Sequence, residues 1–100
     1  MIFRVEFTES AKKSFKKLDV YTQKIIIAWI SKNLQGTDNP RVLGKPLSAN
    51  RAGQWRYRVG DYRIIAKIED DRLIILVLTI TRSLSPLLLR LTNLTFPFGA

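Results

Sequence analysis

Histidine and cysteine are both missing from this chain of 100 residues. Without imidazole or thiolate groups, the usual zinc sites, a Ser-His-Asp triad, a two-histidine ribonuclease centre and disulfides are excluded. We expect neither a metal ion nor a bound cofactor. The lack of thiols also fits a reducing compartment, so we expect a cytoplasmic protein.

Acidic residues are scarce as well. Eight aspartates and glutamates stand against 17 lysines and arginines, which leaves a net charge of +9. A positive charge of this size favours polyanionic partners, namely nucleic acid, an anionic membrane surface or an acidic protein. Charge alone does not choose among the three.

Long apolar runs are a third absence. The most apolar segment, residues 72–80, is far shorter than the roughly 20 residues that a membrane-spanning helix needs. Charges interrupt Met1–Phe7 too often for the hydrophobic region of a signal peptide, and the segment predicts a strand instead. We expect no membrane partner. The length predicts a single domain over residues 1–100.

A helix is predicted after this first strand. Thr8 can cap a helix that extends to Leu18, and the stripe of Ala11, Phe15 and Leu18 predicts a core contact. Lysines cover the other sides of this helix. They form either an RNA or ribosome contact or a solvated helix face. These residues are Lys12, Lys13, Lys16 and Lys17.

A second helix is predicted from about Thr22 to Leu34, after a break at Asp19–Tyr21. This helix is apolar on more than one face, so part of its surface should contact the sheet or a partner. Residues 41–52 lack a clear period and predict a loop. This loop carries Lys45 and Arg51.

The most informative segment is residues 53–63, which read GQWRYRVGDYR. Arginine alternates with bulky apolar residues, a strand pattern, and Gly60-Asp61 interrupts it where a two-residue hairpin would turn. Arg56 and Arg58 therefore lie on one face of a strand. Guanidinium groups held on a sheet donate bidentate hydrogen bonds to phosphate, although a solvated sheet face is the alternative.

Two further strands, residues 61–68 and 72–80, complete the predicted fold. Residues 73–78 are apolar on both faces, which is typical of a strand in the middle of a sheet or under a partner. The predicted fold class is α+β, with an N-terminal strand, a two-helix hairpin and then an antiparallel β-meander.

The run GxWRxRVGDYR, followed by IIAKI, an acidic turn and LIILVL, resembles the central block of the RelE toxins of the RelE/ParE superfamily. The resemblance covers roughly residues 1–80. It implies the toxin of a type II toxin–antitoxin system. RelE-like toxins cut messenger RNA in the ribosomal A site by directing the ribose 2′-hydroxyl onto the adjacent phosphate.

The resemblance also implies roles for single residues. Arg63 matches the family arginine that holds the phosphate, and Arg56 and Arg58 stand where relatives often carry lysines that act in proton transfer. Arginine stays protonated at neutral pH, so both can stabilise charge but are poor bases. With Arg82, they are the predicted catalytic residues. The predicted RNA-binding residues are Lys12, Lys13, Lys16, Lys45, Arg51 and Lys67, and Lys45 and Lys67 are also the candidate proton acceptors.

Residues 81–100 depart from the RelE pattern. They are rich in leucine, and Arg82 and Arg90 are their charged residues, where relatives carry a glycine, basic residues and a tyrosine. A replaced C-terminus, such as a shifted reading frame would produce, is one hypothesis for this tail. We therefore expect weak or absent nuclease activity.

Two other functions remain open from the sequence. A ParE-like toxin of the same fold would inhibit DNA gyrase through protein contacts, and an inactive basic module would bind RNA without cutting it. Each toxin function implies a RelB-like antitoxin that covers the cationic face. The expected partners are this antitoxin, the ribosome and mRNA, and operator DNA only through the antitoxin complex.

Overall fold

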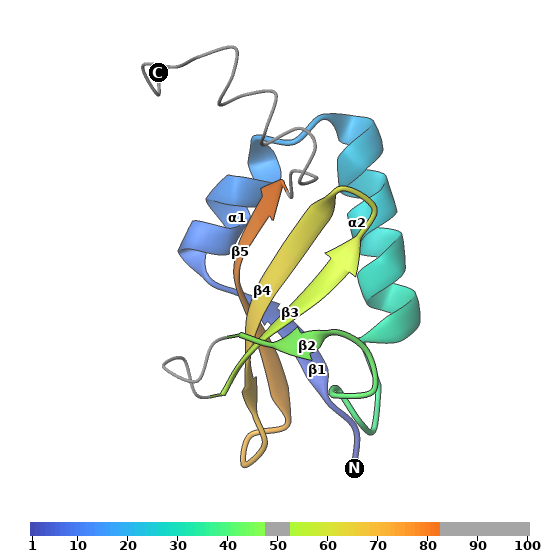
Figure 1. Ribbon diagram of the computed structural model, residues 1–100, viewed down its shortest axis with the longest axis vertical. Helices are drawn as coiled ribbons and strands as arrows, with labels where there is room; N and C mark the ends of the chain where they lie inside the picture. Colours follow the sequence, from blue (N-terminus) through green and yellow to red (C-terminus); the bar gives the residue numbers. More distant parts are fainter. Residues whose placement is uncertain (48–52, 83–100) are drawn as a thin grey trace, which may run out of the picture.

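The computed structural model describes residues 1–47 and 53–82, which form one mixed sheet and two helices (Figure 1). The predicted α+β fold, with a strand, two helices and then antiparallel strands, is confirmed. Arg51 and most of the atypical tail lie outside the described residues. In chain order, the elements are β1 (Arg4–Phe7), α1 (Glu9–Lys16), α2 (Val20–Asn33), β2 (Lys45–Pro46), β3 (Gln54–Val59), β4 (Tyr62–Glu69) and β5 (Ile74–Arg82).

The strand order is β1-β5-β4-β3-β2. The predicted meander of β3, β4 and β5 is antiparallel, and Gly60-Asp61 joins the first two strands as expected. β1 adds a parallel edge, with Arg4 beside Ile74 and Phe7 beside Val77. β5 therefore lies inside the sheet, which explains its apolar residues on both faces.

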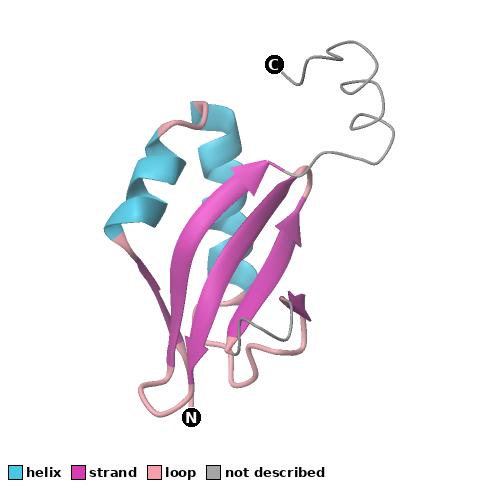
Figure 2. Ribbon diagram, turned by 60° about the vertical axis from the view of Figure 1, so that its left-hand side comes forward, coloured by secondary structure: helices cyan, strands magenta, loops and turns pink. Residues whose placement is uncertain are grey.

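Both helices lie on the same face of the sheet (Figure 2). The core forms between this face and the helices, and residues such as Ala11, Ile26, Tyr57 and Ile64 have no exposed surface there. No helix or strand within residues 1–47 and 53–82 covers the opposite face. Alternate residues of each strand point to this second face.

Side-chain caps set where the helices begin. Thr8 Oγ1 accepts a hydrogen bond from Ala11 N at 3.0 Å, so the predicted cap of α1 is confirmed. The predicted break between the helices is confirmed, but it lies at residues 17–19 and not at Asp19–Tyr21, because the Asp19 carboxylate accepts from Thr22 N at 3.1 Å and α2 begins at Val20. The hydrogen bonds with Thr22 also hold the pKa of Asp19 below its usual value.

Helix α2 carries more apolar surface than the core covers, as its sequence predicts. Ile26 and Ile30 are buried, whereas four other large apolar side chains of this helix are exposed to solvent. Neither helix of the described chain is long and apolar enough to cross a bilayer. The exposed apolar residues of α2 are Val20, Tyr21, Ile25 and Ile27.

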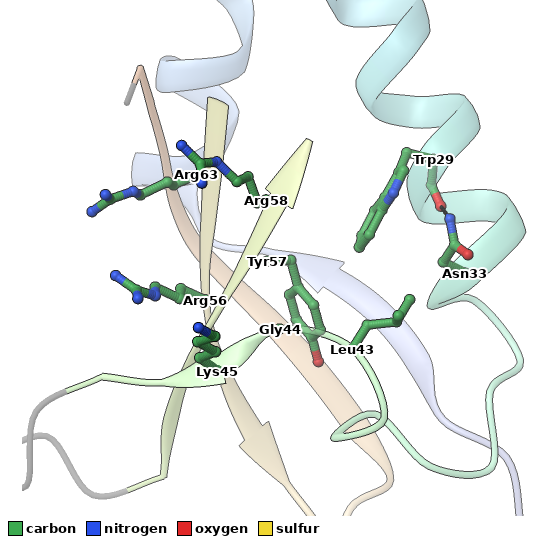
Figure 3. Close-up of a pocket in the computed structure, with 9 residues that line it drawn as sticks. All are labelled: Trp29, Asn33, Leu43, Gly44, Lys45, Arg56, Tyr57, Arg58 and Arg63. Carbon is green, nitrogen blue, oxygen red and sulfur yellow. Dashed lines mark hydrogen bonds between the residues drawn. The ribbon is translucent and has the colours of Figure 1, made fainter. Parts of the chain in front are cut away.

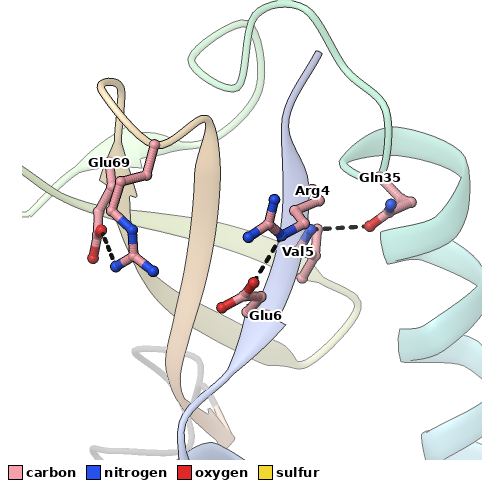
Figure 4. Close-up of polar contacts among 6 residues, drawn as sticks. Arg4, Val5, Glu6, Gln35 and Glu69 are labelled. Carbon is pink, nitrogen blue, oxygen red and sulfur yellow. Dashed lines mark hydrogen bonds and ion pairs between the residues drawn. The ribbon is translucent and has the colours of Figure 1, made fainter.

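The outer edge of β1 is closed by the end of α2 and the turn after it (Figure 4). Val5 N donates to Gln35 Oε1 at 2.9 Å, and Phe3 N donates to Thr37 O at 2.8 Å. Gly36 N donates back to Phe3 O at 2.8 Å. These bonds occupy main-chain groups that would otherwise pair with another strand.

Three contacts hold the segment between α2 and β3 against the sheet. The Tyr57 hydroxyl donates to Pro40 O at 2.6 Å, and Trp55 Nε1 donates to Leu43 O at 2.7 Å. Arg41 donates to both carboxylate oxygens of Asp70, at 2.9 and 2.8 Å, which lowers the pKa of that carboxyl.

The predicted loop at residues 41–52 therefore contains a short strand. Lys45 and Pro46 of β2 lie beside Arg56 and Trp55. Two residues are too short to show a strand period, so the sequence pattern missed this strand. Proline suits its position, because pairs at alternate positions of an antiparallel ladder need no N–H donor.

Replacing Tyr57 with phenylalanine tests the bond that holds this segment. The substitution leaves the carbonyl of buried Pro40 without its donor, so we expect the free energy of unfolding to fall by about 1–3 kcal/mol. Urea denaturation followed by circular dichroism measures this change. Tyr21→Phe is the matched control because Tyr21 is exposed, and an equal loss in both variants would contradict the role of the bond.

The stability should also depend on pH through Tyr57. Burial raises the pKa of its hydroxyl to about 12, whereas an unfolded tyrosine ionises near pH ~10. The unfolded chain loses this proton first, so the stabilisation present below pH ~10 is lost as pH rises through about 12, by up to about 2–3 kcal/mol. Denaturation between pH 8 and 12 should show the wild-type advantage over Tyr57→Phe shrinking. Parallel curves for the two proteins would refute this assignment.

Candidate nucleic-acid interface

Four cationic side chains come together around β3 (Figure 3). Lys45 of β2 pairs with Arg56, and Arg58 pairs with Arg63 of β4. Residues directly opposite each other in an antiparallel pair share a face of the sheet, so these pairs are neighbours. Since Tyr57 points into the core between Arg56 and Arg58, the arginines point to the face without helices. We call Lys45, Arg56, Arg58 and Arg63 the cationic cluster.

No described carboxylate neutralises the cationic cluster. The ion pairs within the described residues use other cations, and none includes a residue of the cluster. A guanidinium group without an internal partner is available for the paired oxygens of a phosphate. The ion pairs are Arg4–Glu6, Lys12–Glu9, Arg41–Asp70 and Arg72–Glu69.

A cavity of about 470 Å³ adjoins the cationic cluster and passes around the edge of β3. Its other lining residues come from α2, from the segment before β2 and from β3, and they include two aromatic rings. The cavity therefore has a cationic side and a largely apolar side. These other lining residues are Trp29, Asn33, Leu43, Gly44 and Tyr57.

Gly44 shapes one end of this cavity. Its φ of 77° lies in the left-handed region, and an added Cβ would lie 2.3 Å from the Arg56 carbonyl oxygen and 2.7 Å from Trp55 Nε1. A side chain is thus excluded both by the backbone conformation and by the lack of space. The glycine lets the chain turn against β3 and then continue into β2.

Trp29 and Asn33 are one helical turn apart on α2, so they occupy the same face of that helix. The Trp29 ring lies 5.8 Å from the Tyr57 ring at an angle of 54°, and both positions of α2 are half-buried. Asn33 Nδ2 donates to Trp29 O at 3.0 Å. The aromatic wall of the cavity is therefore packed in place.

The structure separates the other predicted site residues from the cavity. Lys67 pairs with Gln54 and shares the face of Arg63, but it lies four residues along β4, about 13 Å away, and does not line the cavity. Arg82 pairs with Tyr62, a register that places it on the opposite face from Arg63. The lysines of α1 lie on the helix beside β5 and do not line the cavity either; these are Lys12, Lys13 and Lys16.

Sequence patterns missed the apolar side of the cavity. Trp29 reads as an ordinary core residue of an apolar helix, and Leu43 and Gly44 lie in a segment without a period. The i, i+4 spacing of Trp29 and Asn33 is the one local signal for a mixed aromatic and amide surface. It does not say which strand that surface meets.

The lining residues limit the chemistry of the site. They include no carboxylate, and no group of three acidic side chains elsewhere in the described chain could hold a metal ion. The Tyr57 hydroxyl is buried and already donates to Pro40, and its pKa of about 12 makes it a poor proton donor or acceptor at neutral pH. Besides the three arginines, Lys45 is the lining side chain that carries an amine.

Solved structures of toxins and of toxin–antitoxin complexes share this fold. The RelBE2 toxin–antitoxin complex of Mycobacterium tuberculosis includes a chain with 25% identity and a TM-score of 0.71, over 82% of this chain and 93% of that chain. The isolated E. coli RelE toxin matches with 16% identity and a TM-score of 0.69, over 93% and 98% of the two chains. The YoeB/ParE toxin of Agrobacterium tumefaciens matches with 18% identity and a TM-score of 0.62, over 82% and 100%.

Sequence comparison gives a family assignment that agrees with this fold. A search among curated proteins found no match. The profile of the family described as the ParE toxin of type II toxin–antitoxin system, parDE, matches residues 5–84, which include both helices and all five strands except Arg4, the first residue of β1. The chain therefore belongs to the ParE toxin family of type II toxin–antitoxin systems, within the RelE/ParE superfamily.

Proposed function

We propose that this toxin acts on messenger RNA at the ribosome, as a RelE-like endonuclease that cuts slowly. The observation that carries the proposal is the cationic cluster, four side chains on neighbouring strands with no described carboxylate partner. A polyanion that reaches this face meets rigidly held positive charge. The proposed site of action is the cytoplasm, where ribosomes are found.

The cluster suits one part of RNA cleavage better than the rest. Attack of the 2′-oxygen forms an O2′–P bond and breaks the P–O5′ bond, with one proton lost from O2′ and one gained by O5′. Arg56, Arg58 and Arg63 would stabilise the charge of the pentacoordinate phosphorane. Arginine cannot accept the 2′-proton, so Lys45 is the proposed acceptor among the lining residues. Charge stabilisation with weak proton transfer predicts a low rate.

We also propose a RelB-like antitoxin as the natural partner. Toxin structures similar to this chain include RelBE complexes from Mycobacterium tuberculosis, E. coli and Pyrococcus horikoshii. An acidic segment of the antitoxin would neutralise the cationic cluster, and an apolar segment would cover the exposed residues of α2. Operator DNA would be bound only through this complex.

Inhibition of DNA gyrase is the second candidate function. The observation that favours it is the match to the ParE toxin family over residues 5–84. Such an inhibitor needs a protein-binding surface and no proton acceptor, which the exposed apolar residues of α2 could supply. An inactive RNA-binding module remains the third function to test.

The first test measures mRNA cleavage on programmed ribosomes by primer extension. We expect slow cleavage by the wild-type protein and about a 100-fold lower rate for Arg63→Ala, because that variant removes one group that stabilises the transition-state charge. Arg72→Ala is the matched control, since it also removes one arginine but one that pairs with Glu69 at the β4–β5 turn. Its rate should equal that of the wild type.

Two outcomes would oppose the nuclease proposal. If the wild-type protein leaves mRNA intact and inhibits gyrase supercoiling in the same preparation, gyrase inhibition is the function. If it does neither but binds RNA, the chain is a binding module without activity. Equal cleavage by wild type and Arg63→Ala would refute the role of Arg63.

The second test measures how RNA binding depends on salt. Each phosphate contact to single-stranded RNA contributes about 0.7 to the slope of log affinity against log salt concentration. We therefore expect Arg56→Ala and Arg58→Ala each to reduce the slope by about 0.7. Fluorescence anisotropy with a short labelled RNA measures it. A slope that changes as much in Arg72→Ala would show diffuse charge attraction instead of defined contacts.

A further inference from the structure

Among the described residues, nothing pairs with the edge of β3 at Arg58, which lies beside the aromatic wall of the cavity. Leu47 N donates to Gln54 O at 3.2 Å, so the main-chain groups of Gln54 point toward β2. Main-chain directions alternate along a strand, so those of Arg56 and Arg58 point the same way. Arg56 is paired with Lys45, whereas β2 has no residue beside Arg58.

The chain before β2 does not occupy that position either. Continuation of the ladder would place Leu43 beside Arg58, but Leu43 O accepts from Trp55 Nε1 and Gly44 turns the chain with a φ of 77°. Within the described residues, no loop or turn backbone group bonds to Arg58. The N–H and C=O of Arg58 therefore face the cavity as one donor and one acceptor.

The surrounding walls suit a flat ring. Trp29 presents a half-buried indole that already packs on Tyr57, and Leu43 adds apolar surface on the side of β2. The Asn33 amide stands one turn from Trp29, and its Nδ2 donates to the main chain while the described residues provide no donor to its Oδ1. An aromatic ring with a polar edge could stack here and form hydrogen bonds at the same time.

The cation positions add a second requirement. Arg58 and Arg63 lie beside the same cavity on the far side of β3, so a ligand that fills both parts carries an anion next to its ring. We propose that the cavity is a base-binding subsite, which takes one unpaired nucleobase of the RNA. The base stacks on Trp29, its edge bonds to the main chain of Arg58, and its phosphate lies against Arg58 and Arg63. This subsite rests on the proposed RNA function.

A peptide strand added to β3 is the competing occupant. Strand addition uses the main-chain groups of several residues along an edge. Here, between Arg56, which pairs with Lys45, and the turn at Gly60, Arg58 is the one residue of β3 whose N–H and C=O point to this edge. A base edge needs only one donor and one acceptor. The cavity volume of about 470 Å³ lies in the range of small-ligand pockets.

The test compares ligands that differ only by the base. Isothermal titration of the full chain would use the 5′-monophosphates of adenosine, guanosine, cytidine and uridine, with ribose 5-phosphate as the ligand without a base. At least one nucleotide should bind about tenfold more tightly than ribose 5-phosphate, the increment of one stacked base. Arg63→Ala should weaken both kinds of ligand by the same factor.

Variants of α2 then locate the base. Trp29→Leu should abolish the preference for the nucleotide while leaving affinity for ribose 5-phosphate unchanged, and Trp29→Phe should keep part of the preference. Tyr21→Leu is the matched control, because Tyr21 is an exposed aromatic residue of the same helix outside the cavity. Since Trp29 contacts the core, circular dichroism would verify the fold of each variant, and Trp29→Phe keeps the test valid if Trp29→Leu does not fold.

The outcomes separate this subsite from the proposed function. Equal affinity of the wild type for nucleotides and ribose 5-phosphate would overturn the subsite, even if ribosome-dependent cleavage is observed. A base preference that depends on Trp29 would support it, even if cleavage is absent. A preference unchanged in both Trp29 variants, or binding of an acidic peptide strand at the cavity in place of nucleotides, would also overturn it.

Discussion

The hydrogen bond from the Tyr57 hydroxyl to the Pro40 carbonyl is the contact on which the site geometry depends. Tyr57 is fully buried between the sheet and α2, so its hydroxyl needs a partner inside the protein. Pro40 supplies that partner, so the bond holds the chain after α2 against β3. The ring of Tyr57 also supports Trp29. One buried side chain thus holds the core, the segment before β2 and the aromatic wall of the cavity.

The two edges of the sheet differ in how their main-chain groups are used. At β1, Gln35 and Thr37 accept the N–H groups of Val5 and Phe3, which closes the edge. At the other edge, the short β2 pairs with Trp55 and Arg56 of β3, and no described residue pairs with Arg58. An unpaired sheet edge inside a protein is a site for association. Because this edge lies beside the cationic cluster, its main-chain groups are available to a ligand in the proposed RNA site.

The described cationic side chains have two kinds of role: some form ion pairs within the protein, and others form the cationic cluster. Arg41 forms a bidentate pair with Asp70 that joins the segment after α2 to the β4–β5 turn, and Arg72 pairs with Glu69 in that same turn. The cationic cluster has no such partner among the described residues. Because like charges on adjacent strands repel one another, this arrangement opposes folding slightly and favours an anionic ligand or partner. Function therefore explains the cluster better than stability does.

The sequence alone determined those features that depend on local periodicity and local hydrogen bonds. Alternation in residues 54–59 predicted the strand and its arginine face, Gly60-Asp61 predicted the hairpin, and Thr8 predicted the first helix cap. The start of α2 was missed because Asp19 can serve either as part of a turn or as a cap, and the choice depends on how the helix packs.

Only the tertiary structure decided which distant residues meet. β2 forms because Lys45 and Pro46 pair with residues of β3. Arg82 faces away from Arg63 because of the register between β4 and β5. Trp29 lines the cavity because its ring packs on Tyr57. Each of these contacts joins segments far apart in the chain, and neither composition nor spacing encodes the path between them. Periodicity specifies the faces of single elements, whereas packing and main-chain pairing between elements bring those faces together into a site.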